Sequence, residues 1–188
     1  MRGIWLTIIL AAVMVTLASS AIYLASVQQP REVVIRRFSL TSSAFRDEEE
    51  IPDKYTCEGA DLSPPLRWEG YPKETISFVL IVEDPDAPSG TFMHWVIYNI
   101  PADVNELDEG VPKVERLPFG ALQGVNDFNE VGYSGPCPPP GKPHRYVFKM
   151  YALDIMLDLE PGASEDDVFK AMSGHILAEA TLTGIYSR

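Results

Sequence analysis

The 188-residue sequence is poor in cysteine and in basic residues, and each shortage excludes a class of protein. Two cysteines, Cys57 and Cys137, are too few for a disulfide-dense small scaffold or for a zinc site of four thiolates. Lysine and arginine total 15 against 27 acidic residues, so the net charge is −12. A surface of that sign repels polyanions at long range, so we expect no nucleic-acid partner. Any anion that binds must be held by local geometry.

Motifs of common catalytic centres are also missing. The sequence has no G-x-S-x-G nucleophile elbow, no H-E-x-x-H zinc motif and no glycine-rich phosphate loop with a lysine. We therefore expect a binding protein and not an enzyme, with no catalytic residue, no cofactor and no bound metal.

Charge is absent from residues 3–29, and residues 4–27 form an apolar run of 24 residues. A helix of that length crosses a hydrocarbon core of about 30 Å. Cleavable signals have shorter apolar cores of about 7–15 residues, which favours an uncleaved anchor over a cleaved signal or a buried core helix. We predict that residues 1–30 are a membrane anchor or signal segment with a tether. The domain at residues 31–188 is then membrane-anchored or exported and lies outside the cytoplasm.

Apolar runs rich in β-branched and aromatic residues predict four buried strands. They lie at residues 75–83, 94–100, 145–153 and 176–186. One helix is predicted after Ser164, which can cap it, and Gly174 suits its left-handed C-terminal end. The acidic run 47–50 is typical of a solvated loop. The predicted fold class is mainly β with few short helices, preceded by one N-terminal hydrophobic helix.

Two proline-rich loops enter these strands and carry the residues best suited to chemistry. Asp84 and Asp86 alternate with prolines directly after the first strand, and His94 opens the second. A stretch rich in glycine and proline at residues 132–143 precedes His144, just before the third strand. Proline fixes φ and holds the preceding residue extended, so these loops are stiff. If the strands are neighbours, both histidines and a carboxylate converge at one rim.

A carboxylate that accepts a hydrogen bond from an imidazole fixes its tautomer and raises its pKa. Two imidazoles set in this way suit a small oxyanion such as a phosphoryl head group, and backbone N–H groups can add donors. Ordinary structural explanations also exist, since a histidine can satisfy a core hydrogen bond, an aspartate can cap a turn, and Arg145 can pair with a surface acid. The similar placement of both histidines favours the binding site.

Two alternatives use the same region. In a hydrolase acting on a small ester or phosphoester, Ser134 would be the nucleophile and His144 its base. In a metal site, Asp84, His94 and His144 would form a two-histidine, one-carboxylate set, although no local ligand spacing supports it.

The order of these motifs resembles the phosphatidylethanolamine-binding protein family, also called Raf kinase inhibitor-like proteins, in its bacterial and archaeal branch. The motifs are the run 78–89 that ends in D-P-D-A-P-S, the H-W pair at 94–95, G-P-C-P-P at 135–139 and H-R-Y at 144–146. The resemblance extends over residues 38–188.

The resemblance implies that residues 31–188 form a β-sandwich with a small anion pocket. The implied ligand-binding residues are Asp84, His94, His144, Gly135 and Pro136, and the implied supporting residues are Asp86, Arg145 and Tyr146. The implied partners are a small anionic ligand of the phosphoryl or phospholipid head-group type and, as a further role, a protease or kinase that the protein inhibits. The membrane is contacted through the N-terminal segment.

The two cysteines lie in predicted loops, and Cys137 belongs to the proline loop of the implied pocket. A disulfide, two free thiols, and a metal or catalytic use are all compatible with the sequence. A bridge would close a loop of about 80 residues and contribute about 4 kcal/mol at most in the loop-entropy treatment.

Overall fold

Residues 36–188, which the computed structural model describes, form two β-sheets, one short 3₁₀ helix, and one α-helix that lies on the larger sheet. The strands are β1 (Arg36–Arg37), β2 (Ser39–Thr41), β3 (Glu49–Glu50), β4 (Leu66–Glu69), β5 (Ser77–Asp84), β6 (Phe92–Pro101), β7 (Glu106–Leu107), β8 (Leu122–Gln123), β9 (His144–Leu153) and β10 (Ile176–Tyr186). The helices are η1 (Asp53–Tyr55) and α2 (Glu165–Met172). The larger sheet has the order β1-β10-β9-β5-β6-β8, with β3 also paired to β10, and the smaller has the order β2-β4-β7.

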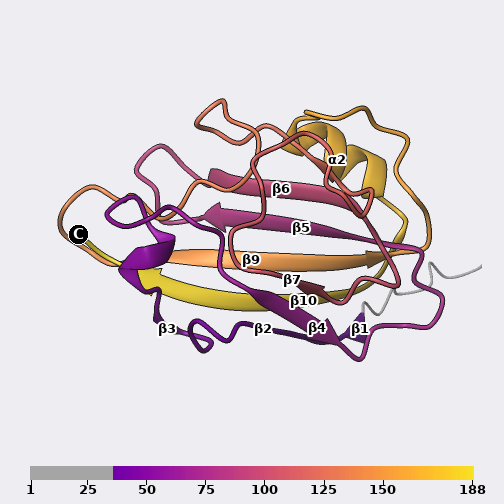
Figure 1. Cartoon of the computed structure of the whole chain (residues 1–188), viewed down its shortest axis with the longest axis horizontal. Helices are drawn as coiled ribbons and strands as arrows, with labels where there is room; N and C mark the ends of the chain where they lie inside the picture. Colours follow the sequence, from indigo (N-terminus) through magenta and orange to yellow (C-terminus); the bar gives the residue numbers. More distant parts are fainter. Residues whose placement is uncertain (1–35) are drawn as a thin grey trace, which may run out of the picture. The chain divides into compact units, whose positions relative to one another are not determined.

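The four predicted strands are the four long strands of the larger sheet, which lie side by side in Figure 1. Strand β10 has the predicted bounds, β9 begins one residue earlier than predicted, and β5 and β6 each differ from the prediction by one or two residues at both ends. Strand β5 pairs antiparallel with both β6 and β9. The mainly β fold class is therefore confirmed for the described residues.

Alternate residues of β5 enter two separate cores. Phe78 and Leu80 pack toward the smaller sheet around Trp68, whereas Val79 and Ile81 pack on the opposite face, toward α2. Every residue of β5 is buried, because both faces of the larger sheet are covered. An uninterrupted apolar run is the sequence pattern that such a strand requires.

The predicted helix is confirmed as α2. The Ser164 side chain caps it by accepting a hydrogen bond from the backbone N–H of Asp167, and Val168 and Met172 are buried against the sheet. Gly174 follows with a φ of +83°, the left-handed geometry that glycine adopts without a steric cost.

The acidic run is exposed as predicted, but Glu49–Glu50 forms strand β3, paired in parallel with β10, so the run is not entirely loop. Within residues 36–188, no helix has both the length and the apolar character needed to cross a membrane. The predicted hydrophobic helix, anchor or signal at residues 1–30 lies outside the described residues.

Candidate functional site

A cavity of about 350 Å³ opens at the end of the larger sheet where β5 ends and β9 begins. Its lining residues come from these strands, from β6 and from the loops beside them. They are Asp84, Ala87, Pro88, Ser89, Phe92, His94, Phe128, Cys137, Pro138, Pro139, His144 and Tyr146. This cavity contains the polar groups that the sequence suggested for an anion site.

Strand order brings these groups together. Because β5 runs antiparallel to β6 and β9, its C-terminal end meets the N-terminal ends of both neighbours. Glu83 pairs with Met93 on one side and with Val147 on the other. Asp84, His94 and His144, which are separated in the sequence, are therefore neighbours in space.

His144 and Asp84 form a buried pair. The His144 Nδ1 lies 2.7 Å from Asp84 Oδ2, and the side chains are only 9% and 4% exposed. The other carboxylate oxygen, Oδ1, accepts a hydrogen bond from the backbone N–H of Asp86 at 2.8 Å. Both oxygens of Asp84 thus have protein donors, and the carboxylate fixes the orientation of the His144 ring.

A β-bulge places His94. Val82 pairs with Trp95 and the next residue, Glu83, pairs with Met93, so His94 is an extra residue in β6 without a partner on β5. Bulges reorient side chains and are common beside functional sites. Here Met93 enters one core, Trp95 enters the other, and the His94 side chain contributes to the cavity wall.

The His94 ring is held by backbone and aromatic neighbours. Its Nδ1 donates to the carbonyl oxygen of Ser134 at 2.6 Å, and the Ser134 N–H donates to the carbonyl oxygen of His94 at 3.1 Å. The rings of Phe92, Phe128 and Tyr146 all contact it edge to face. Burial lowers the pKa of His94, and the Ser134 carbonyl and the Asp84 carboxylate only partly oppose this.

Tyr146, for which the resemblance implies a supporting role, lies next to His94. It lines the cavity, and its buried hydroxyl has no hydrogen-bond partner among the described residues. Burial, and then the nearby Asp84 carboxylate, raise the pKa of Tyr146, so the hydroxyl stays protonated.

Asp86 and Arg145 lie beside the cavity and not in its lining. The Arg145 side chain donates from Nε at 2.8 Å and from Nη2 at 2.7 Å to the two oxygens of Asp86, and its backbone N–H also donates to this carboxylate. This arrangement joins the loop after β5 to the start of β9, which is a supporting role.

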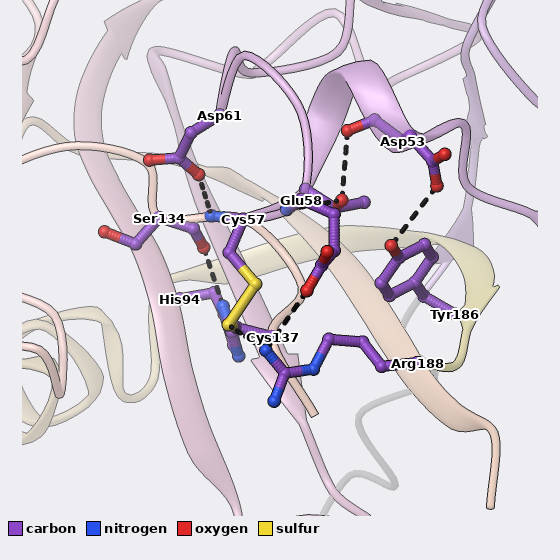
Figure 2. The surroundings of a disulfide bond; sticks show 11 residues. Asp53, Cys57, Glu58, Asp61, His94, Ser134, Cys137, Tyr186 and Arg188 are labelled. Carbon is purple, nitrogen blue, oxygen red and sulfur yellow. Dashed lines mark hydrogen bonds and ion pairs between the residues drawn. A yellow bond between two sulfur atoms is a disulfide. The ribbon is translucent and has the colours of Figure 1, made fainter. Parts of the chain in front are cut away.

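Cys57 and Cys137 form a disulfide, with 5.4 Å between their Cα atoms. Figure 2 shows this bond close to the hydrogen bond between His94 and Ser134. Cys137 lines the cavity, so the disulfide attaches one wall of the cavity to the segment that contains Cys57.

Gly135 and Pro136, which the resemblance implies as a wall of the pocket, are not among the residues that line the cavity. The Gly135 N–H donates to Asp61 Oδ1 at 2.7 Å, and the Pro136 carbonyl accepts from the Cys57 N–H at 3.1 Å. These backbone groups are occupied in anchoring the loop. The wall is formed by the next residues along the chain, Cys137 to Pro139.

Asn126 is a structural residue of the site that the sequence did not reveal. Its buried amide donates to the carbonyl of Gly132 and to Ser134 Oγ, both at 3.0 Å, and accepts from the N–H groups of Phe128 and Glu130. It thereby joins the loop that carries Phe128 to the loop that carries Ser134. An isolated asparagine in a polar stretch gives no periodic signal for this role.

The observed geometry matches neither the hydrolase alternative nor the metal-site alternative. Ser134 Oγ donates to Glu130 and accepts from Asn126, so it is not hydrogen-bonded to His144, and Ser134 does not line the cavity. Within residues 36–188, no group of three His, Cys, Asp or Glu side chains is arranged to hold a metal ion.

Sequence comparison matches residues 41–187 to the family model of the phosphatidylethanolamine-binding proteins. A UPF0098 protein of Methanothermobacter thermautotrophicus is 56% identical over 150 residues, which cover 80% of this chain and 99% of that relative. A UPF0098 protein of Chlamydia trachomatis is 45% identical over 154 residues, which cover 79% of this chain and 98% of the relative.

Two crystal structures resemble the fold. One is a phosphatidylethanolamine-binding protein homologue from Chlamydia trachomatis, with a TM-score of 0.74 and 43% identity over 81% of this chain and 99% of that chain. The other is E. coli YbcL, described as a new member of the mammalian family, with a TM-score of 0.76 and 36% identity over the same shares of the two chains.

Proposed function

This chain belongs to the phosphatidylethanolamine-binding protein family, and we propose that its domain is a binding protein whose cavity holds a small anionic group of the phosphoryl type. The observation that carries this proposal is the buried His144–Asp84 pair beside His94 in one cavity. Such a pair presents an oriented imidazole to a ligand.

The donors of the cavity suit an oxyanion. His144 uses Nδ1 toward Asp84, so its Nε2 is the nitrogen left for a ligand, and it donates to an anionic oxygen when the ring is an imidazolium. Tyr146 also lines the cavity, but its hydroxyl is fully buried. The aromatic rings of Phe92 and Phe128, which contact each other, offer an apolar surface to the organic part of a phosphoryl ester.

Calorimetric titration of the full chain in detergent with inorganic phosphate tests this proposal. We expect Asp84→Asn to weaken phosphate binding at least tenfold, because the oriented, charge-assisted contact to His144 is lost. Asp154→Asn is a matched control, since Asp154 accepts from the exposed His175 at 2.8 Å at the opposite end of the sheet. Absence of phosphate binding by the unaltered chain, or equal affinity in Asp84→Asn, would contradict the proposal.

The proposal includes binding without turnover. Incubation with p-nitrophenyl phosphate and with an activated carboxylic ester should release no p-nitrophenol above background. Turnover that disappears in Ser134→Ala would support the hydrolase alternative instead. The protease- or kinase-inhibiting role suggested by the family is a separate hypothesis about exposed loops, and it predicts inhibition that His144→Ala leaves unchanged.

We also propose that the domain acts outside the cytoplasm, anchored or exported through residues 1–30. The Cys57–Cys137 disulfide supports this location, because disulfides persist in oxidising compartments. Protease added to intact cells that express the full chain should digest the domain. Protection until the cells are lysed would contradict the proposed location.

A further inference from the structure

The tautomer of His94 follows from its contacts. A carbonyl oxygen can only accept, so the hydrogen between His94 and Ser134 belongs to His94 Nδ1. This bond fixes the ring, and three aromatic rings contact it edge to face. His94 is thus fixed with one nitrogen toward Ser134 and the other away from it.

The second nitrogen of His94 is an acceptor. Burial lowers the pKa of this histidine, which favours the neutral ring. A neutral imidazole with its hydrogen on Nδ1 carries only a lone pair on Nε2. Nδ1 faces Ser134, which does not line the cavity, whereas His94 itself does. Nε2, on the other side of the ring, is therefore the nitrogen that a ligand in the cavity would contact.

The charge of the cavity also restricts the ligand. Asp84 brings a carboxylate into the lining, and none of the lining residues is a lysine or an arginine. The nearby Arg145 is already paired with Asp86 through two hydrogen bonds. A doubly charged anion would therefore face the Asp84 carboxylate with only the His144 imidazolium as a counter-charge, whereas a singly charged anion meets less repulsion.

From these observations we infer that the cavity binds a phosphoryl group that still carries a proton more tightly than an anion of the same shape and charge that has no such proton. His94 is the residue that distinguishes the two ligands. The P–OH of the ligand donates to His94 Nε2, while an anionic oxygen of the ligand accepts from His144 Nε2. A sulfate ester has no such proton, so its oxygen would place a lone pair against that of His94. The inference rests on the proposed function and specifies the form of ligand that the site takes.

Methyl phosphate and methyl sulfate form a matched pair of probes. At about pH 5.5, below the second phosphoryl pKa of about 6, methyl phosphate is chiefly a monoanion like methyl sulfate and differs from it by one P–OH proton. Titration of the full chain in detergent should give methyl phosphate at least a tenfold advantage, the size expected for one hydrogen bond to a charged ligand. Equal affinities, or tighter binding of methyl sulfate, would overturn the inference while leaving anion binding intact. Failure of both probes to bind would instead overturn the proposed function.

Replacement of the acceptor tests the role of His94 itself. His94→Phe keeps an aromatic ring and removes the lone pair, so the ratio of the two affinities should fall to about one, with thermal unfolding as the check that the variant folds. Nitrogen NMR of the histidine rings tests the same point without a substitution. At the titration pH the free protein should show His94 protonated at Nδ1 and bare at Nε2, with the Nε2 signal moving on addition of methyl phosphate alone. An imidazolium, or the opposite tautomer, would overturn the inference.

Discussion

The two loops that border the cavity are both rich in proline, yet they are held in place by different means. The acidic loop, residues 84–90, is fixed by its own carboxylates: Asp84 accepts from the Asp86 N–H, and Asp86 binds Arg145. The proline loop, residues 132–143, is fixed mainly from outside, by the disulfide to Cys57 and by the acceptor Asp61.

The difference shows what proline contributes and what it does not. Proline restricts backbone torsions within a loop, but it cannot choose the neighbour against which the loop lies. Charged hydrogen bonds position the acidic loop and a covalent bond positions the proline loop. We therefore expect the acidic loop to respond to low pH and the proline loop to respond to reductant.

Removal of the disulfide should have the largest effect. The bond closes a loop of 80 residues, and its loss in Cys57→Ser/Cys137→Ser should lower the free energy of unfolding by up to about 4 kcal/mol. Chemical denaturation with and without dithiothreitol measures this. The unaltered chain should lose stability on reduction and the double variant should not change, whereas equal stability of all samples would show that the other contacts suffice to hold the proline loop.

Asp84→Asn should have the next largest effect. The substitution removes the charged acceptor of a buried hydrogen bond to His144, which costs about 1–3 kcal/mol of unfolding free energy. Urea denaturation is the measurement, with the exposed Asp154→Asn as control. If Asp84→Asn loses no more unfolding free energy than Asp154→Asn, then Asp84 does not stabilise its end of the acidic loop.

Asp61→Ala should have an intermediate effect on the proline loop. It leaves the buried Gly135 N–H without its acceptor, at a cost of about 1 kcal/mol. Because Asp61 also binds Lys113 at 2.8 Å, Lys113→Ala is the control that separates the ion pair from the backbone contact. If both variants lose the same stability, the Gly135 contact contributes nothing.

Asp86→Asn should have the smallest effect, because the Asp86–Arg145 pair is partly exposed. The side-chain hydrogen bonds of Arg145 lower the pKa of Asp86 from 3.8 to about 2. The pair therefore stabilises the fold fully above the unfolded-state pKa, and this contribution disappears as the pH falls from about 4 to about 2. Acid-unfolding curves should show that the difference in stability between the unaltered chain and Asp86→Asn disappears toward pH 2. A difference in stability that grows toward low pH would contradict the role given to this ion pair.

Much of the fold could be predicted from the sequence because β5, β6, β9 and β10 are long and strongly apolar. The smaller sheet was not predicted, since strands of two to four residues such as β7 are too short to show a period. In the site, Asp84, His94 and His144 were identified from their positions at strand ends, and their approach follows from the antiparallel order of the sheet.

Other features of the site depend on contacts that the sequence does not encode locally. The bulge at His94 arises from the register between β5 and β6, which one strand alone cannot reveal. Phe128 enters the cavity lining from a loop that is organised by the buried amide of Asn126. The family motif implies that Gly135 belongs to the pocket, but it does not show that Asp61 accepts the Gly135 N–H.

The most direct test of the central claim is proton NMR of the three histidine rings during titration with inorganic phosphate. His94 and His144 line the cavity, whereas His175 lies at the other end of the sheet and serves as an internal control. We predict that the ring signals of His94 and His144 move together and saturate while those of His175 stay in place. Movement of all three alike, or of none at millimolar phosphate, would contradict the proposed binding site.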